Sequence, residues 1–151
     1  TLQSVIDCSR SDRDATLIAD GGIRNSGDIV KALAAGADFV MLGSLIAGSD
    51  ESPGEAIYMN GEKHRTYRGM ASKDAQIDWR GHTASVEGVS SIIPDKGPVS
   101  NVLLGLETGI RSGLSYTGSR TITELQSKNK MIKQTSSGAI ESSTHISKIR
   151  S

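Results

Sequence analysis

Two short apolar runs, each closed by a glycine turn, constrain the fold of this chain more than any other feature. The first run is residues 16–19, followed by Asp20-Gly21-Gly22, and the second is residues 39–42, followed by Gly43-Ser44. Between them, residues 26–35 carry apolar side chains at helical spacing. This order is typical of buried parallel strands joined by a helix in an α/β protein, and two such units do not distinguish a barrel from an open sheet.

The rest of the chain predicts further elements from periodicity and turn residues. We expect a short amphipathic helix at 2–8, a hairpin with an Asn-Gly turn at 56–67 and a polar functional loop at 68–98. A long helix at 99–116, a short helix at 121–126 capped by Thr121 or Ser119, a strand at 131–135 and a tail without apolar periodicity at 136–151 follow. Ser26 is the expected N-cap of the helix at 26–35, Gly36 its stop, and residues 45–47 a short helical segment.

Charge and cysteine usage exclude several classes of protein. The 17 basic and 17 acidic side chains cancel, so no net field favours nucleic acid or an anionic membrane, and no apolar run approaches the roughly 20 residues that span a bilayer. The lone cysteine, Cys8, excludes an intrachain disulfide and fits a cytoplasmic protein. We interpret Cys8 as a buried structural thiol rather than a nucleophile. The three histidines lack metal-ligand spacing.

The glycine turns carry the first functional prediction. Backbone N–H groups exposed where a strand hands over to a helix form an anion-binding hollow, and glycine lets a phosphate oxygen approach them. Gly21-Gly22 and Gly43-Ser44 are two such turns on consecutive strands, and the Asp20 carboxylate is suited to grip a ribose diol. The pattern predicts a nucleoside monophosphate site, with ordinary βα turns built from small residues as the alternative.

A series of motifs extends along nearly the whole chain and resembles the IMP dehydrogenase/GMP reductase family. The matching segments are residues 18–24, 27–37, 40–48, 51–55, 67–72, 87–89, 96–98 and 109–113. The resemblance implies an α/β fold, the C-terminal part of a (β/α)8 TIM barrel with an inserted flap and C-terminal tail. It divides the chain into the last two βα units with the phosphate-binding turns, the hairpin and active-site flap, the closing helices and strand, and a Ser-rich tail, at residues 1–48, 49–98, 99–135 and 136–151.

The same resemblance implies roles for individual residues. Asp20 matches the ligand of the ribose hydroxyls, and the phosphate ligands are Gly22, Gly43, Ser44 and the phenol of Tyr67. The segment that meets the purine base is Gly69, Met70 and Ala71, while Glu87 matches a residue at the purine edge that relays a proton in catalysis. The alternatives are packing beneath the hairpin for Tyr67 and Met70, and a solvated loop charge for Glu87.

Activity, cofactors and assembly are likewise implied by the resemblance. Members pass a hydride between the purine and NADP or NAD, after attack by a cysteine in a glycine-rich loop that precedes the strand ending in Asp20. This chain does not contain that loop, so we expect it to be inactive alone. A homotetramer is implied, as is a K⁺ site at Glu141, Ser142 and Ser143, with a disordered tail as the alternative.

The flap bears on which reaction is catalysed. The flap, residues 71–86, is short and contains Trp79-Arg80-Gly81 but no Arg-Tyr pair to activate water. This favours a GMP reductase, which catalyses the NADPH-dependent deamination of GMP to IMP. Residues 23–27 and the tail are more similar to IMP dehydrogenases, which oxidise IMP to XMP with NAD. We therefore keep IMP dehydrogenase as an alternative, together with a non-catalytic nucleotide-binding fragment and a different phosphate-binding barrel enzyme. His82 on the flap is a further candidate for proton movement.

Overall fold

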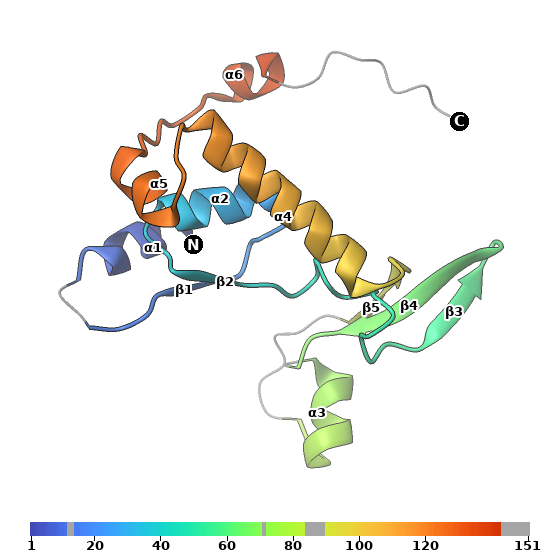
Figure 1. Ribbon diagram of the computed structural model, residues 1–151. Coiled ribbons are helices and arrows are strands. Elements are labelled where there is room, and N and C mark those ends of the chain that lie inside the picture. Colours follow the sequence, from blue (N-terminus) through green and yellow to red (C-terminus); the bar gives the residue numbers. More distant parts are fainter. Residues whose placement is uncertain (12–13, 71, 84–89, 143–151) are drawn as a thin grey trace.

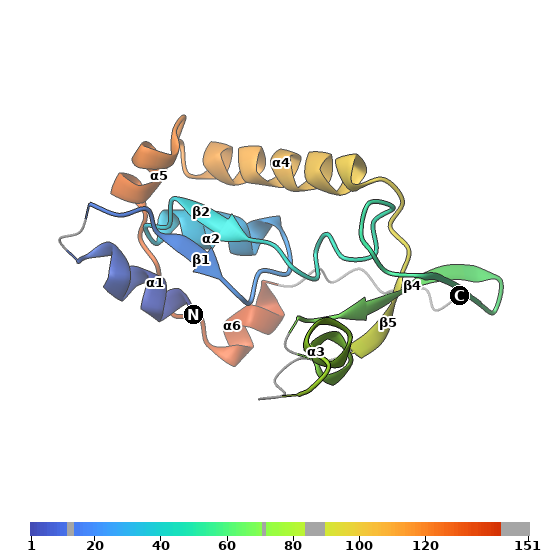
Figure 2. The ribbon, with the colours of Figure 1, turned by 90° about the horizontal axis from the view of Figure 1, so that it is seen from below.

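The computed structural model describes residues 1–11, 14–70, 72–83 and 90–142, and the structural statements below concern these residues. Two sheets lie at opposite ends of the molecule, and the long helix α4 reaches from one toward the other (Figures 1 and 2). In chain order the elements are α1 (Leu2–Ser9), β1 (Ile18–Asp20), α2 (Ser26–Ala34), β2 (Phe39–Met41), β3 (Ala56–Met59), β4 (Glu62–Arg68), α3 (Lys73–Arg80), β5 (Ser90–Pro94), α4 (Val99–Tyr116), α5 (Ile122–Lys128) and α6 (Ser136–Glu141).

The expected parallel unit is confirmed. Strands β1 and β2 pair in parallel, with Ile18 opposite Phe39 and Asp20 opposite Met41, and α2 connects them. Ala19 is buried beneath the helices, but Ile18, Phe39 and Met41 on the other face are each about half exposed or more, so the expectation of strands buried on both faces is wrong for the described residues. Among the described residues, helices cover only one face of this sheet, and its two strands do not close a barrel (Figure 1).

Helix α2 forms the centre of the core. Its apolar side Ile29 and Leu33 packs with Leu125 of α5, and partly buried side chains of α4 complete the cluster. The N-cap is Asn25 rather than the expected Ser26, because the Asn25 Oδ1 accepts the Asp28 amide at 2.9 Å. After the helix ends, Gly36 takes a φ of 109°, as its position after the C-terminus requires.

Helix α4 approaches α2 closely, and two glycines explain how. A methyl group added at Gly113 would lie 2.6 Å from a methyl of Val30, and one added at Gly109 would lie 2.4 Å from the Cβ of Ser26. One at Gly105 would meet no atom within 4 Å. Gly109 and Gly113 therefore bring the helices together, and the glycines do not interrupt the predicted helix at 99–116.

The hairpin is confirmed and belongs to a three-stranded antiparallel sheet in the order β3-β4-β5. Asn60 and Gly61 take φ values of 52° and 83°, as a two-residue type I′ turn requires. The expectation of a loop throughout residues 68–98 is wrong, since α3 and β5 lie within it. Helix α3 has few apolar side chains. It begins after Ser72, whose hydroxyl accepts the Ala75 amide, and ends at Gly81 with a φ of 74°.

Several smaller expectations also change. Cys8 is exposed rather than buried, because α1 buries only Val5. Residues 45–47 form a turn, and residues 131–135 form no strand, with Ile132 88% exposed for lack of a neighbouring strand. The Ser-rich tail contains α6, capped by the hydroxyl of Thr135, while the cap of α5 is Thr121, as predicted. No described helix is both long and apolar enough to cross a membrane.

Candidate functional site

The two glycine turns lie at one edge of the parallel sheet. Asp20 and Met41 are the last paired residues of β1 and β2, and Gly22 and Gly43 each follow two positions later. Carboxyl ends of neighbouring parallel strands face the same way, and ligands of open α/β sheets bind outside these ends. The juxtaposition predicted from sequence is therefore present.

The turn after β2 presents three consecutive backbone N–H groups. The amides of Gly43, Ser44 and Leu45 make no hydrogen bond to any described residue. Their carbonyls are all occupied: that of Gly43 accepts the amides three and four residues later, each at 3.1 Å, and those of Ser44 and Leu45 accept from Lys96 Nζ at 2.7 and 2.9 Å. Successive free N–H groups beside satisfied carbonyls are the arrangement that binds anions.

The turn after β1 has the same character. Gly21 and Gly22 take φ values of 85° and 81°, which other residues rarely adopt, and the amides from Gly21 to Ile23 make no hydrogen bond to described residues. A methyl group added at Gly21, Gly22 or Gly43 would meet no atom within 4 Å. The space over both turns is open to a ligand.

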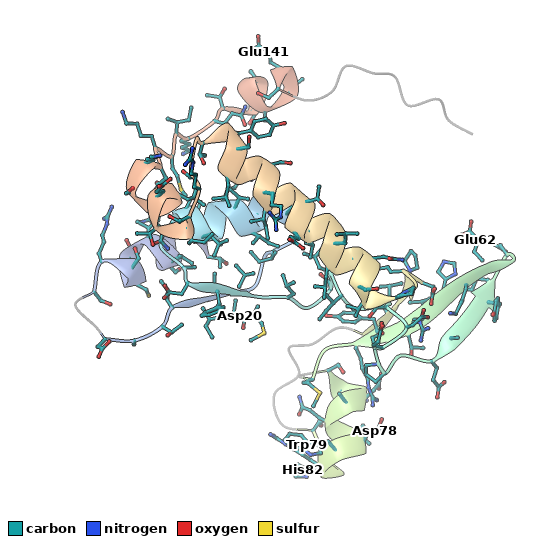
Figure 3. The ribbon with its side chains drawn as sticks, viewed as in Figure 1. Asp20, Glu62, Asp78, Trp79, His82 and Glu141 are labelled. Atoms are coloured by element: carbon teal, nitrogen blue, oxygen red, sulfur yellow. The ribbon has the colours of Figure 1, made fainter. Side chains whose placement is uncertain are left out.

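Asp20 stands between the strand and its glycine turn. Its side chain lies on the face of the sheet away from α2, because Ala19 on the other face is buried (Figure 3). Within the described part of the chain, no hydrogen bond or ion pair engages the Asp20 carboxylate. A carboxylate with all its acceptor positions available can receive bonds from two neighbouring hydroxyls.

A cavity of about 940 Å³ joins the β2 end to the antiparallel sheet, and Gly43 and Tyr67 both line it. Tyr67 is half-buried on β4. Four acidic side chains, Glu51, Glu55, Asp74 and Asp78, also line the cavity, as does Arg68, which pairs with Asp78. Because the carboxylates repel a phosphate dianion, it is stabilised near the donors of the lining, which include the Gly43 amide, the Tyr67 phenol and the Arg68 guanidinium.

The structure separates some residues that the sequence grouped. Gly22 opens into a second, smaller pocket of about 150 Å³ between α1 and α2, while Asp20 and Ser44 line neither hollow. Gly69 follows β4 directly and its carbonyl accepts the Ser72 amide at 2.9 Å, and Met70 is 69% exposed, which contradicts the packing alternative for Met70. Ala71, Glu87 and Ser143 lie outside the described residues.

A cluster of four charges, not predicted from the sequence, joins the antiparallel sheet to the segment that follows β2. The Arg65 guanidinium, only 11% exposed, pairs with Asp95 and with Asp50 at 2.6 Å each, and Lys63 pairs with Asp95 at 3.1 Å and with Asp50 at 3.4 Å. The Arg65 hydrogen bond lowers the pKa of Asp95 to about 2. Like charges at alternate positions of β4 were the available signal, because such side chains share one face.

The remaining candidates occupy the two ends of the molecule. Trp79 and His82 project from the far end of α3, where the Arg80 guanidinium lies 4.6 Å from the centre of the Trp79 ring (Figure 3). Glu141 ends α6, and the Ser142 hydroxyl donates to the Gly138 carbonyl at 2.7 Å. No three His, Cys, Asp or Glu side chains among the described residues gather as metal ligands.

The fold and the site define a class: an α/β protein whose strand ends present free amides, of the kind that binds a phosphate group. Residues 1–145 match the model of the IMP dehydrogenase/GMP reductase domain, and the chain belongs to this family of oxidoreductases. It is 43% identical to an inosine-5′-monophosphate dehydrogenase of Nitrosopumilus maritimus and 42% identical to a GMP reductase of Leishmania major, over 95% and 98% of the chain. It spans about a third (33%) of the length of each relative.

A solved structure supports the same relationship. The GMP reductase of Trypanosoma brucei in complex with guanosine 5′-monophosphate superposes with a TM-score of 0.88 at 40% identity. The match covers 97% of this chain and 32% of the other. The predicted family and the α/β fold are thus confirmed.

Proposed function

We propose that the intact protein is a purine nucleotide oxidoreductase and that this chain provides the phosphate and ribose ends of its mononucleotide site. The observation that carries the proposal is a run of three amides, at Gly43, Ser44 and Leu45, that bond to none of the described residues. They lie on the sheet edge that also holds Gly22 and Asp20. The related reductase of Trypanosoma brucei binds guanosine 5′-monophosphate, which has the phosphate and the diol that these groups suit.

Each group then has a chemical task. The amides after β2 and the Gly22 amide donate to the phosphate oxygens, with the Tyr67 phenol as a further donor, and Asp20 accepts from the ribose hydroxyls. The backbone around Gly69, Met70 and Ala71 meets the purine. Glu87 relays a proton at the purine edge.

We favour reductive deamination over oxidation, on one observation about the flap. A reductase converts GMP, NADPH and two protons into IMP, NADP⁺ and ammonium, whereas a dehydrogenase converts IMP, NAD⁺ and water into XMP, NADH and a proton. The second reaction needs a base for water, and Arg80 is the candidate on α3. A guanidinium is a hydrogen-bond donor with no acceptor position, which opposes that role, and the Arg80 guanidinium lies over the Trp79 ring.

Cofactor, cation and assembly complete the proposal. The nicotinamide coenzyme, NADPH for a reductase, supplies the hydride, and none of the described residues is assigned to it. We propose K⁺ at Glu141, Ser142 and Ser143 and a homotetramer from the resemblance, and a cytoplasmic location from the lone cysteine.

The proposal is tested by turnover of the intact protein. We expect NADPH consumption with GMP and release of ammonium in equal amounts. NAD-dependent formation of XMP from IMP, without turnover of GMP, would replace the reductase by the dehydrogenase. Tight binding of GMP with turnover of neither nucleotide would replace both by a non-catalytic binding protein.

A site variant connects the activity to this sheet edge. Asp20→Asn keeps the shape of the side chain and removes its charge, so it should weaken GMP binding about tenfold or more, because hydrogen bonds to a charged group contribute about 1.5–3 kcal/mol. Asp38→Asn is not a neutral control, since the Asp38 carboxylate accepts the Leu17 amide. Glu62→Gln at the hairpin tip is remote from Asp20 and should leave binding unchanged (Figure 3).

A further inference from the structure

Lys96 holds the turn after β2 from behind. Its Nζ donates to the carbonyls of Ser44 and Leu45 at 2.7 and 2.9 Å, and its backbone amide donates to the Gly48 carbonyl at 2.9 Å. One residue, about fifty positions away in sequence, thus fixes both ends of the segment from Ser44 to Gly48. Partial burial lowers the pKa of the Lys96 ammonium.

Peptide geometry turns this contact into control of the anion-binding amides. A planar trans peptide points its carbonyl and the following N–H in opposite directions. Because the Ser44 and Leu45 carbonyls face Lys96, the amides of Leu45 and Ile46 face away from it. The Ile46 amide bonds to Gly43, so the Leu45 amide remains for a ligand, together with those of Gly43 and Ser44.

We propose that Lys96 is a positioning residue for the 5′-phosphate of the nucleotide, an inference that rests on the proposed function. Its ammonium holds two carbonyl oxygens on the side of the turn away from the ligand. Without that ammonium the carbonyls must turn toward water, and a carbonyl that rotates into the hollow repels the dianion and withdraws the adjacent N–H.

The location of Lys96 is set by the antiparallel sheet. Its neighbour Asp95 pairs with Arg65 and Lys63, and the Asp95 amide donates to the Lys63 carbonyl at 3.1 Å. Strand β4, which carries Tyr67, therefore also places Lys96. The two parts of the site that meet the phosphate are held in one arrangement.

The test compares two ligands that differ only in the phosphate. Calorimetry on the intact protein measures the affinity for GMP and for guanosine in wild type, Lys96→Met and Lys96→Arg. We expect Lys96→Met to weaken GMP binding about tenfold to a hundredfold, the factor that a hydrogen bond from a charged donor contributes, and to leave guanosine unchanged. Lys96→Arg keeps a cationic donor and should recover most of the GMP affinity.

Two further variants keep the test decisive. Lys133→Met removes the same charge from an exposed position outside the site and should change neither affinity. Lys96→Gln retains an N–H donor without charge, so its GMP affinity should fall between those of wild type and Lys96→Met. If Lys96→Met does not fold, Lys96→Gln takes its place in the comparison.

Each outcome is informative. Equal loss of GMP and guanosine in Lys96→Met would show a general structural role and overturn the inference. Unchanged GMP affinity in Lys96→Met, in a protein whose wild type prefers GMP to guanosine, would also overturn it and leave the proposed function standing. A wild type without preference for GMP over guanosine would overturn the proposed function itself.

Discussion

Replacing Gly113 by alanine should loosen the contact between α4 and α2. The added methyl group would lie 2.6 and 2.9 Å from the two methyl groups of Val30, closer than real carbon contacts. Val30 is β-branched and held in one rotamer by its helix, so it cannot swing aside, and the helices must separate. Overpacking of this kind costs about 1–3 kcal/mol.

A second alanine variant separates this cost from helix propensity. Alanine exceeds glycine by about 1 kcal/mol in a helix interior, so Gly113→Ala should lose about 1 kcal/mol net. At Gly105 the new methyl meets no atom within 4 Å, and Gly105→Ala should gain about 1 kcal/mol. Both positions lie inside α4, so the propensity gain cancels and the difference between the variants is the packing cost.

Urea unfolding of the chain measures both variants, with the free energy extrapolated to water and the slope compared with that of wild type. Combining Gly113→Ala with Val30→Ala should restore part of the loss, because the smaller partner makes room, and the coupling should be about 1 kcal/mol. Equal free energies of unfolding for Gly113→Ala and Gly105→Ala, within about 0.5 kcal/mol, would refute the close approach of the helices.

Three further outcomes follow from single contacts. Arg65 holds the pKa of Asp95 near 2, below its ordinary 3.8, so the contribution of this ion pair to the free energy of unfolding is complete above pH 3.8 and lost as the pH falls toward 2. Carboxyl NMR should show the Asp95 titration midpoint near 2. An unchanged midpoint in Arg65→Met would contradict Arg65 as the cause. Glu51→Ala should lower the free energy of unfolding in urea by about 1 kcal/mol, because the Glu51 carboxylate accepts the Val99 amide at the start of α4. Glu51→Gln keeps an acceptor oxygen and should retain most of the wild-type stability, so equal losses in the two variants would refute the cap. Asn25→Ala should lower the free energy of unfolding in urea by about 1 kcal/mol and Asn25→Ser by far less, because serine keeps a side-chain acceptor for the Asp28 amide. Equal losses in the two variants would show that Asn25 does not cap α2.

Local patterns predicted much of the fold because their causes are local. Apolar runs, the Asn60-Gly61 turn and the periodicity of 99–116 gave β1, β2, the hairpin and α4. Helix α3 was missed because its cap and stop, Ser72 and Gly81, flank a segment with few apolar side chains.

The candidate site divides in the same way. The glycine turns and Asp20 are visible in the sequence, because their chemistry depends on neighbouring residues. The part played by Lys96 depends on carbonyls about fifty positions away, and the pairing of Arg65 with Asp95 joins residues 30 positions apart. Alternation along β4 places Lys63 and Arg65 on one face, but it does not predict which distant residues they contact, since these contacts arise from the folded arrangement of distant segments.

The hairpin, α3 and β5 form an excursion that leaves and rejoins the molecule at one neck. There the Lys96 amide bonds to Gly48, the Asp50 amide bonds to Gly97, and Glu51 bonds to Val99. Because these hydrogen bonds hold its two ends together, the excursion can lengthen or shorten at little entropic cost. Under the proposed function, sequence changes within this excursion can alter which reaction the intact protein favours, while the backbone amides after β1 and β2 keep their arrangement.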